Sequence, residues 1–237
     1  QRRLFRARRR PHFMATLFLV RHGQASFGAA NYDCLSDTGR QQSRWLGEYF
    51  RDRGVQFRRV VAGTLVRQQD TASEILAGMG ISDLPVASHP GLNEYDGESL
   101  YRNFTNGADH RAHQNGDYQD YWRTFRAAFA AWTQDQLTGM PETWGEFGQR
   151  MQAALAHATE GASREDALLV VSSGGAIGRA VADLLGAPTQ TAIELNLQFR
   201  NTGFCELIVG RGTQRLLSFN NVPHLELPER RPAITFA

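Results

Sequence analysis

Short apolar runs alternate with longer amphipathic segments along most of this chain. Strands are predicted where the apolar runs are short, at about 16–20, 59–62, 85–88, 167–171, 204–209 and 215–219. Helices are predicted where apolar side chains recur every three or four residues, at about 36–53, 65–77, 118–132, 143–155 and 174–185. This order predicts an α/β fold, a three-layer α/β/α sandwich whose mostly parallel sheet has helices on both faces.

Capping signals support two of the predicted helix starts. Ser36 or Asp37 can act as the N-cap of the first helix, and Gly54 follows its last turn. Thr143 and Glu146 have the spacing of a capping box. These signals are independent of the apolar pattern and agree with it.

Residues 92–163 interrupt the alternation of strands and helices. The stretch from Ser99 to Gly116 is polar and rich in Gly and Asn, so we expect a loop there. Aromatic residues then recur at helical spacing: Tyr118, Tyr121, Trp122, Phe125, Phe129 and Trp132. Such a stripe is typical of core packing, and the alternative is a substrate cleft lined by Trp and Tyr. We therefore predict a single domain over 14–237 with a helical cap insertion over about 95–163.

The charge of the chain is unevenly distributed. The net charge is +2, but residues 1–13 contain six arginines and no acid, which leaves −4 for residues 14–237. A mildly acidic body argues against nucleic-acid binding. We interpret residues 1–13 as a disordered leader or an expression remnant ahead of Met14, with a transit peptide or a tether to anionic surfaces as alternatives.

The composition also limits the compartment. No apolar stretch approaches the roughly eighteen residues that a membrane span needs, so no membrane association is expected. The two cysteines, Cys34 and Cys205, are far apart and lack metal or redox spacing. A reducing compartment, the cytoplasm, is predicted.

Arg21, His22 and Gly23 directly follow the first predicted strand. In open α/β folds the carboxyl ends of the strands are where ligands bind. An imidazole at this edge can act as a nucleophile, and a guanidinium beside it can bind a phosphoryl group through two hydrogen bonds. The tripeptide alone is weak evidence for such a site, and the polar motifs that follow later predicted strands strengthen it.

These motifs together resemble the histidine phosphatase superfamily, in its phosphoglycerate-mutase-like branch. The matching segments are Arg21-His22-Gly23, Leu35 to Gln41, Ala62 to Arg67 with Thr71-Ala72, Leu92-Asn93-Glu94, Ser173-Gly174-Gly175, Asn201-Thr202-Gly203 and Asn221 to Leu225. The resemblance covers almost the whole chain from Met14 to about Glu226. It implies hydrolysis or transfer of a phosphoryl group through a phosphohistidine, without metal or cofactor.

The resemblance also implies a role for each matching residue. His22 would be the nucleophile, Glu94 the general acid with Asp96 as the alternative, and Arg21, Arg67, Ser173 and Gly174 the phosphate-binding groups. Gln24 and His224 are possible accessory residues. The phosphate's own charge and burial would keep Glu94 partly protonated near neutral pH.

One position departs from the family pattern. The family's second histidine would stand at 173, where this chain has Ser173, so we assign the chain to a subgroup with serine there. The serine hydroxyl and the N-terminus of the next helix can still donate hydrogen bonds to an anion. His224 is considered as a replacement cation.

The predicted activity is hydrolysis of a small organic phosphate ester. The alternative is a pseudo-phosphatase that binds a phosphorylated ligand with little or no turnover. Mutase activity is disfavoured because only eleven residues separate Gly23 from Leu35.

Asp109, His110 and His113 have a spacing that could bind a metal ion, but the segment is polar, so we prefer to interpret it as a solvated loop. A homodimer is possible, and the sequence leaves the oligomeric state open.

Overall fold

The fold is built on one six-stranded mixed sheet, in a computed structural model that describes residues 14–26, 33–107, 118–210 and 212–236. The strands are β1 (Ala15–Arg21), β2 (Phe57–Ala62), β3 (Val86–Ser88), β4 (Ala167–Ser172), β5 (Phe204–Gly210) and β6 (Thr213–Asn221). Their order is β3-β2-β4-β1-β5-β6. The first four run parallel to their neighbours, whereas β5 is antiparallel to β1 and β6 to β5. The predicted α/β fold with a mostly parallel sheet is confirmed.

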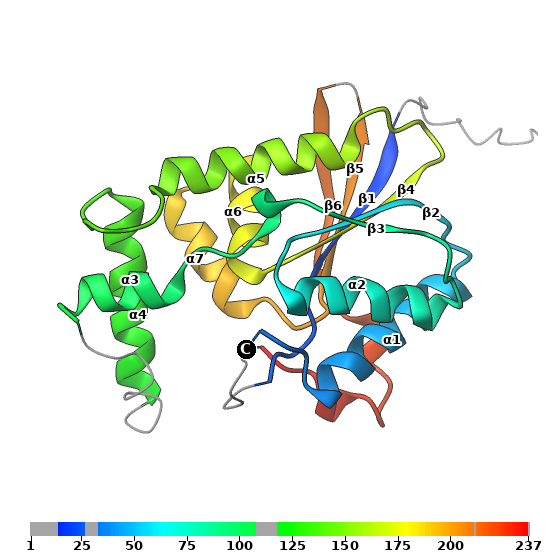
Figure 1. The fold of residues 1–237 in the computed structure, drawn as a ribbon, viewed down its shortest axis with the longest axis horizontal. Coiled ribbons are helices and arrows are strands. Elements are labelled where there is room, and N and C mark those ends of the chain that lie inside the picture. The colour runs from blue at the N-terminus through cyan, green and yellow to red at the C-terminus, as the bar shows by residue number, and fades with distance from the viewer. Residues whose placement is uncertain (1–13, 27–32, 108–117, 211, 237) are drawn as a thin grey trace, which may run out of the picture.

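Helices cover both faces of this sheet (Figure 1). They are α1 (Asp37–Asp52), α2 (Val66–Met79), α3 (Gly97–Phe104), α4 (Tyr118–Thr133), α5 (Trp144–Thr159), α6 (Gly174–Leu185) and α7 (Thr189–Gln198). Short 3-10 turns lie at Pro90–Leu92, Pro223–Leu225 and Arg231–Ala233. Helices α1 and α2 lie on one face and α5 and α6 on the other, while α3 and α4 stand to one side of the sheet.

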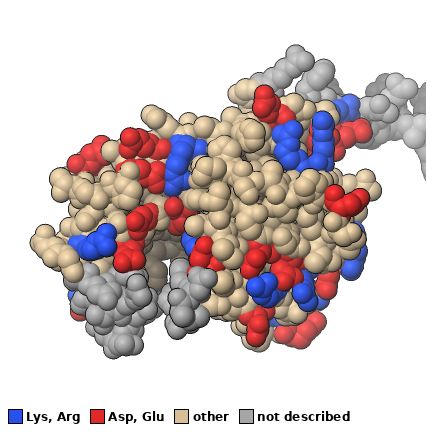
Figure 2. Space-filling model, in the orientation of Figure 1, with Lys and Arg blue, Asp and Glu red and all other residues tan. Residues whose placement is uncertain are grey.

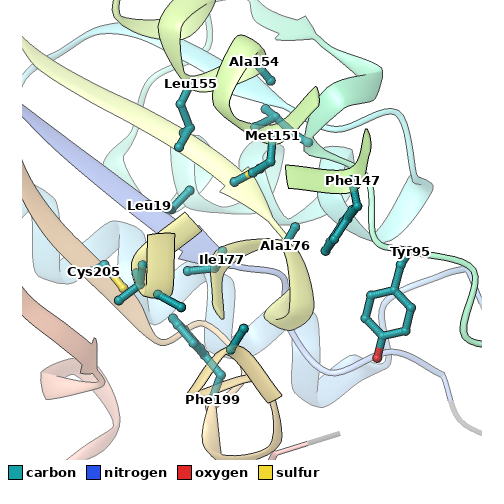
Figure 3. Close-up of a cluster of buried hydrophobic side chains, with 14 of the residues drawn as sticks. Leu19, Tyr95, Phe147, Met151, Ala154, Leu155, Ala176, Ile177, Phe199 and Cys205 are labelled. Carbon is teal, nitrogen blue, oxygen red and sulfur yellow. The ribbon is translucent and has the colours of Figure 1, made fainter. Parts of the chain in front are cut away.

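The two cores follow from the alternation of side chains along a strand. In β1, Leu17 and Leu19 join the cluster with α5 and α6, whereas Phe18 and Val20 join the cluster with α1 and α2. Figure 3 shows Leu19 facing Ile177 of α6. Because the apolar strands β1 and β4 are covered on both faces, the polar groups that follow them are held at a fixed edge of the sheet.

The predicted capping signals are present in the structure. Ser36 accepts a hydrogen bond from the Gly39 N–H at the start of α1. Thr143 and Glu146 form the complete capping box of α5. These caps satisfy backbone N–H groups that would otherwise lack partners in the first helical turn.

Two helices were not anticipated. A loop was expected from Ser99, but α3 occupies 97–104, because Asp96 caps its first turn and Leu100 and Tyr101 are buried. Helix α7 follows Pro188, which makes no side-chain cap, and only two of its residues are buried, so its apolar pattern is weak. Both helices depend on packing more than on local signals.

The aromatic stripe of the insertion is mainly core. Phe125, Phe129 and Trp132 are buried, and Tyr95 packs against the last two at ring-centroid distances of 5.1 and 5.4 Å. The core interpretation is confirmed for these three. The leader 1–13 and the remainder of the expected loop, 108–117, lie outside the described residues.

On the face shown in Figure 2, the basic and acidic side chains of the described residues are interspersed. Basic and acidic side chains of the described residues also pair across elements, as in Arg40 with Asp70 at 3.0 Å and Arg58 with Asp166 at 2.6 Å. This face therefore differs from the clustered basic surface typical of nucleic-acid binding.

Candidate active site

His22 is the first residue after β1, at the carboxyl edge of the sheet. Arg21 and His22 are 8% and 6% exposed. The His22 N–H donates to the Ser172 carbonyl at the end of β4, at 2.9 Å. The His22 carbonyl accepts from Asn201 Nδ2 and from the Thr202 N–H, each at 3.3 Å. The backbone of the histidine is therefore held by the end of β4 and by the segment that precedes β5.

The hydrogen bonds of His22 define its tautomer. Nδ1 lies 2.7 Å from the Gly23 carbonyl, which can only accept, so Nδ1 carries the proton. Arg67 Nε donates to Nε2 at 3.2 Å, so Nε2 presents a lone pair. Burial, and then the positive charges of Arg67 and Arg21, hold the pKa of His22 well below its usual 6.5. The imidazole is therefore uncharged at neutral pH, with its nucleophilic nitrogen beside a cation.

Gly23 is required by the close approach of α1 to this loop. A Cβ at this position would lie 2.5 Å from the Gly39 carbonyl oxygen. The Gly23 N–H donates to Thr71 Oγ1 at 3.0 Å, and that hydroxyl donates to the Arg67 carbonyl at 2.7 Å. These contacts tie the loop that carries His22 to the helix that carries Arg67.

Arg67 lies in the first turn of α2 and is oriented by Asp33. Arg67 Nη1 lies 2.8 Å from Asp33 Oδ1, and Asp33 Oδ2 accepts from the Val66 N–H at 2.9 Å. Because the N-cap residue, Leu65, has no side chain that can cap the helix, the distant carboxylate performs that role. Asp33 thus fixes both the helix start and the guanidinium.

Arg21 binds two backbone carbonyls that are distant from it in the sequence. Its Nη1 donates to the carbonyls of Phe199 and Phe236. The segment leading to Phe236 is held by a hydrogen bond from the Asn201 N–H to the Thr235 carbonyl at 2.9 Å. The C-terminal segment therefore returns to the loop after β1, as Figure 1 also shows.

Glu94 lies against the first turn of α6. Its Oε2 accepts from the Gly175 N–H at 2.9 Å, and its Oε1 accepts from the Ala176 N–H at 3.1 Å. Gly175 permits this approach, because a Cβ there would lie 2.5 Å from Glu94 Oε1 and 2.3 Å from the Tyr95 ring. The helix N-terminus that was expected to face a phosphate thus also binds a carboxylate of the chain itself.

The pKa of Glu94 is raised above its usual 4.5. Burial is the main cause, and it is opposed by the hydrogen bond from Gly175 and by the charges of Arg67 and Arg21. A raised pKa increases the protonated fraction near neutral pH, as a general acid requires. The influence of both arginines also places Glu94 within the same charged cluster as His22.

Ser173 and Gly174 lie between these groups. Gln68 Nε2 donates to Ser173 Oγ at 2.8 Å and to the Leu92 carbonyl at 3.2 Å. A Cβ on Gly174 would lie 3.4 Å from Arg21 Nε. The structure therefore brings together five of the predicted residues, which are Arg21, His22, Arg67, Glu94 and Gly174. Ser173 precedes Gly174 in the chain, and its hydroxyl is bonded to Gln68.

Two predicted secondary residues have structural contacts elsewhere. Gln24 Oε1 accepts from Ser36 Oγ at 2.9 Å, next to the start of α1. Asp96 caps α3 by accepting from the Ser99 N–H at 2.9 Å and from its hydroxyl at 2.6 Å. Glu94, and not Asp96, is therefore the carboxylate that meets α6.

His224 is buried against the segment that precedes β5. Its Nε2 lies 2.8 Å from Thr202 Oγ1. Burial, with a smaller effect of the Arg230 charge, lowers its pKa to about 3. An imidazole that is neutral at physiological pH adds no positive charge to a phosphate site, which argues against His224 as a replacement cation.

Three residues that contact this cluster were not predicted from the sequence. Gln68 is buried beside Ser173, Asp33 holds Arg67, and Arg150 contacts the segment that carries Glu94. Their separations along the chain give no signal of these contacts. Only the position of Gln68, next to Arg67 on the inward face of a helix, could have drawn attention to it.

Among the described residues, no three His, Cys, Asp or Glu side chains are grouped so as to hold a metal ion. The considered ligands Asp109, His110 and His113 lie outside those residues. In the part of the chain that the structure describes, no helix combines the length and apolar character needed to cross a membrane.

The fold is that of an α/β protein with a histidine and two arginines clustered at the carboxyl edge of its sheet. The model of the histidine phosphatase superfamily (branch 1) matches residues 17–222. The chain belongs to this superfamily.

Curated relatives include both mutases and a phosphatase. A probable phosphoglycerate mutase GpmB of Erwinia tasmaniensis is 29% identical over 194 residues, covering 79% of this chain and 82% of that protein. The 2,3-bisphosphoglycerate-dependent phosphoglycerate mutase of Bartonella quintana is 34% identical over 87 residues, 34% of this chain and only 42% of its own length. A broad-specificity phosphatase of Saccharomyces cerevisiae is 31% identical over 84 residues, 33% of this chain and 36% of that protein.

Solved structures share the fold. The phosphoglycerate mutase of Bacillus anthracis has a TM-score of 0.63 at 18% identity, covering 90% of this chain and 96% of that one. At this identity the likeness establishes the architecture alone.

Proposed function

We propose that this protein is a phosphomonoester hydrolase that works through a phosphohistidine at His22. The observation that carries the proposal is the contact of Arg67 Nε with His22 Nε2 at 3.2 Å, around an imidazole whose pKa is well below 6.5. An uncharged nucleophile beside two guanidinium groups suits a phosphate ester, which carries nearly two negative charges.

The first step transfers the phosphoryl group to His22. The Nε2 lone pair forms a bond to phosphorus while the bond from phosphorus to the ester oxygen breaks, and that oxygen takes the proton of Glu94. Arg67 Nε, which donates to Nε2 in the free enzyme, has to transfer its hydrogen bond to a phosphoryl oxygen as phosphorus approaches. Arg21 and Arg67 stabilise the charge that spreads over the transferring oxygens.

The second step releases phosphate. A water molecule attacks phosphorus, and the Glu94 carboxylate accepts the proton of that water. The nitrogen–phosphorus bond breaks and returns its electron pair to Nε2, which restores the free imidazole. One carboxyl group thus serves as acid and then as base, and its raised pKa supports that exchange near neutral pH.

Ser173 would complete the phosphate site with a neutral donor. Since the Leu92 carbonyl can only accept, the Gln68 group that contacts both it and Ser173 is the NH₂. Ser173 Oγ therefore accepts from Gln68 and keeps its own proton for an anion. This arrangement supports the proposed subgroup with serine at the second-histidine position.

The substrate class proposed is a small organic phosphate ester. The segment of eleven residues between Gly23 and Leu35 argues for hydrolysis over mutase chemistry, which has to retain a doubly phosphorylated intermediate. In this proposal His22 supplies the nucleophile, Glu94 the proton transfers and the two arginines the positive charge, and no step is assigned to a cofactor.

The test is hydrolysis of p-nitrophenyl phosphate by the wild type and by His22→Ala. His157→Ala, an exposed histidine on α5, is the matched control. The wild type and the control should release phosphate and form an acid-labile phosphoenzyme, while His22→Ala should do neither. Equal inactivity of the wild type and His22→Ala would refute the proposal.

The second candidate is a phosphate-binding pseudo-phosphatase, and Ser173 favours it. Loss of one transition-state donor commonly lowers rates by about 100- to 1,000-fold. This candidate predicts that vanadate binds and protects the protein against unfolding, while no ester is hydrolysed. Turnover that depends on His22 would exclude it.

A further inference from the structure

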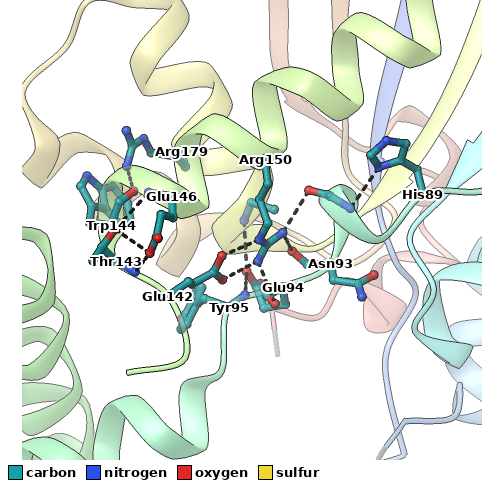
Figure 4. Close-up of polar contacts among 12 residues, drawn as sticks. His89, Asn93, Glu94, Tyr95, Glu142, Thr143, Trp144, Glu146, Arg150 and Arg179 are labelled. Atoms are coloured by element: carbon teal, nitrogen blue, oxygen red, sulfur yellow. Dashed lines mark hydrogen bonds and ion pairs between the residues drawn. The ribbon is translucent and has the colours of Figure 1, made fainter. Parts of the chain in front are cut away.

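Arg150 of α5 contacts the segment that carries Glu94 (Figure 4). Its Nη1 donates to the Gly91 carbonyl at 3.0 Å and to the Asn93 carbonyl at 2.8 Å. Its Nη2 donates to the Glu94 carbonyl at 3.4 Å. One guanidinium therefore binds three carbonyls within four residues of the chain.

The Arg150 guanidinium is itself held in place. Its Nε lies 2.6 Å from Glu142 Oε2, and its Nη2 lies 2.7 Å from Glu142 Oε1, so the pair is bidentate. The Phe147 ring lies 4.7 Å below the guanidinium carbon. All five N–H groups of Arg150 are thus used, two by Glu142 and three by the segment 91–94. A flexible lysine could not reproduce this planar set.

Glu94 is consequently fixed from two sides. Its backbone is bound by α5 through Arg150, and its carboxylate is bound by α6 through the N–H groups of Gly175 and Ala176. The remaining carbonyl of the segment, that of Leu92, accepts from Ser172 Oγ at 2.6 Å. Without Arg150 the backbone of this segment would be released, and the N–H groups of α6 alone would hold the Glu94 carboxyl group.

We propose that Arg150, held by Glu142, is a positioning residue for the general acid Glu94. The inference rests on the proposed function, since it requires Glu94 to protonate the leaving oxygen. A general acid must lie within hydrogen-bond distance of the atom it protonates, and misplacement by about 1 Å can cost about 100-fold. The insertion between β3 and β4 thereby contributes to catalysis without touching the substrate.

The expected signature is a dependence on the leaving group. An alkyl phosphate expels a strongly basic oxygen and needs the proton from Glu94. A dinitrophenyl phosphate expels a weakly basic oxygen and needs little protonation. Because kcat/KM reports the steps up to formation of the phosphohistidine, loss of the acid should lower kcat/KM for the alkyl ester far more than for the aryl ester.

Arg179 offers a matched control. It also pairs with a carboxylate, Asp183, at 2.7 Å, donates to a backbone carbonyl, that of Trp144, at 2.7 Å, and lies 4.2 Å from the Trp144 ring. Its contacts do not include residues 91–94. Arg179→Met therefore reports the structural cost of losing a part-buried arginine in the same region.

The experiment measures kcat/KM for an alkyl phosphate and for 2,4-dinitrophenyl phosphate in the wild type, Arg150→Met, Arg150→Lys, Arg179→Met, Glu94→Gln and His22→Ala. Arg150→Met should lower the alkyl value by about 100-fold and the dinitrophenyl value by less than about 5-fold, with the same pattern as Glu94→Gln. Arg150→Lys should recover little, and Arg179→Met should change both values equally.

The outcomes separate the two proposals. If the wild type has no activity that His22→Ala abolishes, the proposed function fails, and the positioning role fails with it. If the activity depends on His22 but Arg150→Met lowers kcat/KM equally for both esters, or for neither ester, only the positioning role fails. If Arg150→Met does not fold by circular dichroism, Glu142→Gln, which keeps one hydrogen bond to Arg150, is measured with the same pair of esters and must show the same selective loss.

Discussion

Gln68 Nε2 lies 2.8 Å from Ser173 Oγ, and both side chains are completely buried. The amide thus lies beside position 173, where the resemblance to the family implies a histidine. Serine and glutamine together supply hydrogen bonds without adding charge. The structure suggests that the two residues work as a unit, which makes position 68 relevant to any change at 173.

Ser173→His alone should not increase activity. An imidazole is larger than a hydroxymethyl group, and Gln68 Nε2 leaves it no room, so overpacking should cost about 1–3 kcal/mol of stability. The double variant Gln68→Ala with Ser173→His frees that room and adds a donor to the phosphate site. Its kcat/KM for p-nitrophenyl phosphate should exceed that of Ser173→His by ~10-fold or more.

Gln68→Ala is the control for the double variant, and urea unfolding measures each stability. A single Ser173→His variant that is as stable as the wild type would show that the two positions are independent.

His22 should remain neutral well below pH 6.5. Burial is the largest cause of its lowered pKa, followed by the charges of Arg67 and Arg21. Arg67→Met removes the second cause, so the pKa of His22 should rise toward 6.5 while remaining below it. A titration followed by NMR of the His22 ring nitrogens measures both proteins. Protonation of His22 at or above pH 6.5 in the wild type would contradict the neutral nucleophile.

His224 should make stability depend on pH. Its pKa is about 3 in the folded protein and 6.5 when unfolded, so its contribution is complete above pH 6.5 and is lost as the pH falls toward 3. Between pH 7.5 and 5.5 the free energy of unfolding should fall by about 1.4 kcal/mol because of this one group.

His224→Gln keeps a group that can hydrogen-bond Thr202 but does not titrate. Urea unfolding at pH 7.5 and pH 5.5 measures the free energy of unfolding of both proteins. Its fall between these pH values should be smaller in the variant than in the wild type by about 1.4 kcal/mol. Because all other groups are shared, equal falls in the two proteins would rule out the assigned role of His224.

Gly175→Ala should displace the general acid. A methyl group there would lie 2.5 Å from Glu94 Oε1 and 2.3 Å from the Tyr95 ring, both inside normal contact. We expect kcat/KM for an alkyl phosphate to fall by about 100-fold, as for other displacements of about 1 Å. Steady-state kinetics on the alkyl ester provides the measurement.

Gly145→Ala is the matched control, since Gly145 is likewise the second residue of its helix, α5. A methyl group there would have Thr143 Oγ1, at 3.8 Å, as its nearest neighbour. This variant should keep full activity. An equal loss in both variants would mean that the glycine substitution acts through helix stability.

The sequence predicted the strands and most helices because their signals are local. Apolar runs mark β1 and β4, and Ser36 and Thr143 mark helix starts. It missed α3 and α7, whose signals are weaker than the packing that forms them. For the same reason it could not assign Asp96, which caps a helix that the pattern did not indicate.

The sequence by itself determined the resemblance to the family, the order of the strands and most helices, and the identity of Arg21, Arg67 and Glu94 as the charged residues near His22. The tertiary structure decided what each of those residues contacts: Arg67 on Nε2 of His22, Glu94 on the start of α6, Gln68 on Ser173, and Arg150 behind Glu94. The physical reason is that apolar periodicity and capping act within a few residues, whereas these contacts join residues 45 to 105 positions apart and depend on how the elements pack.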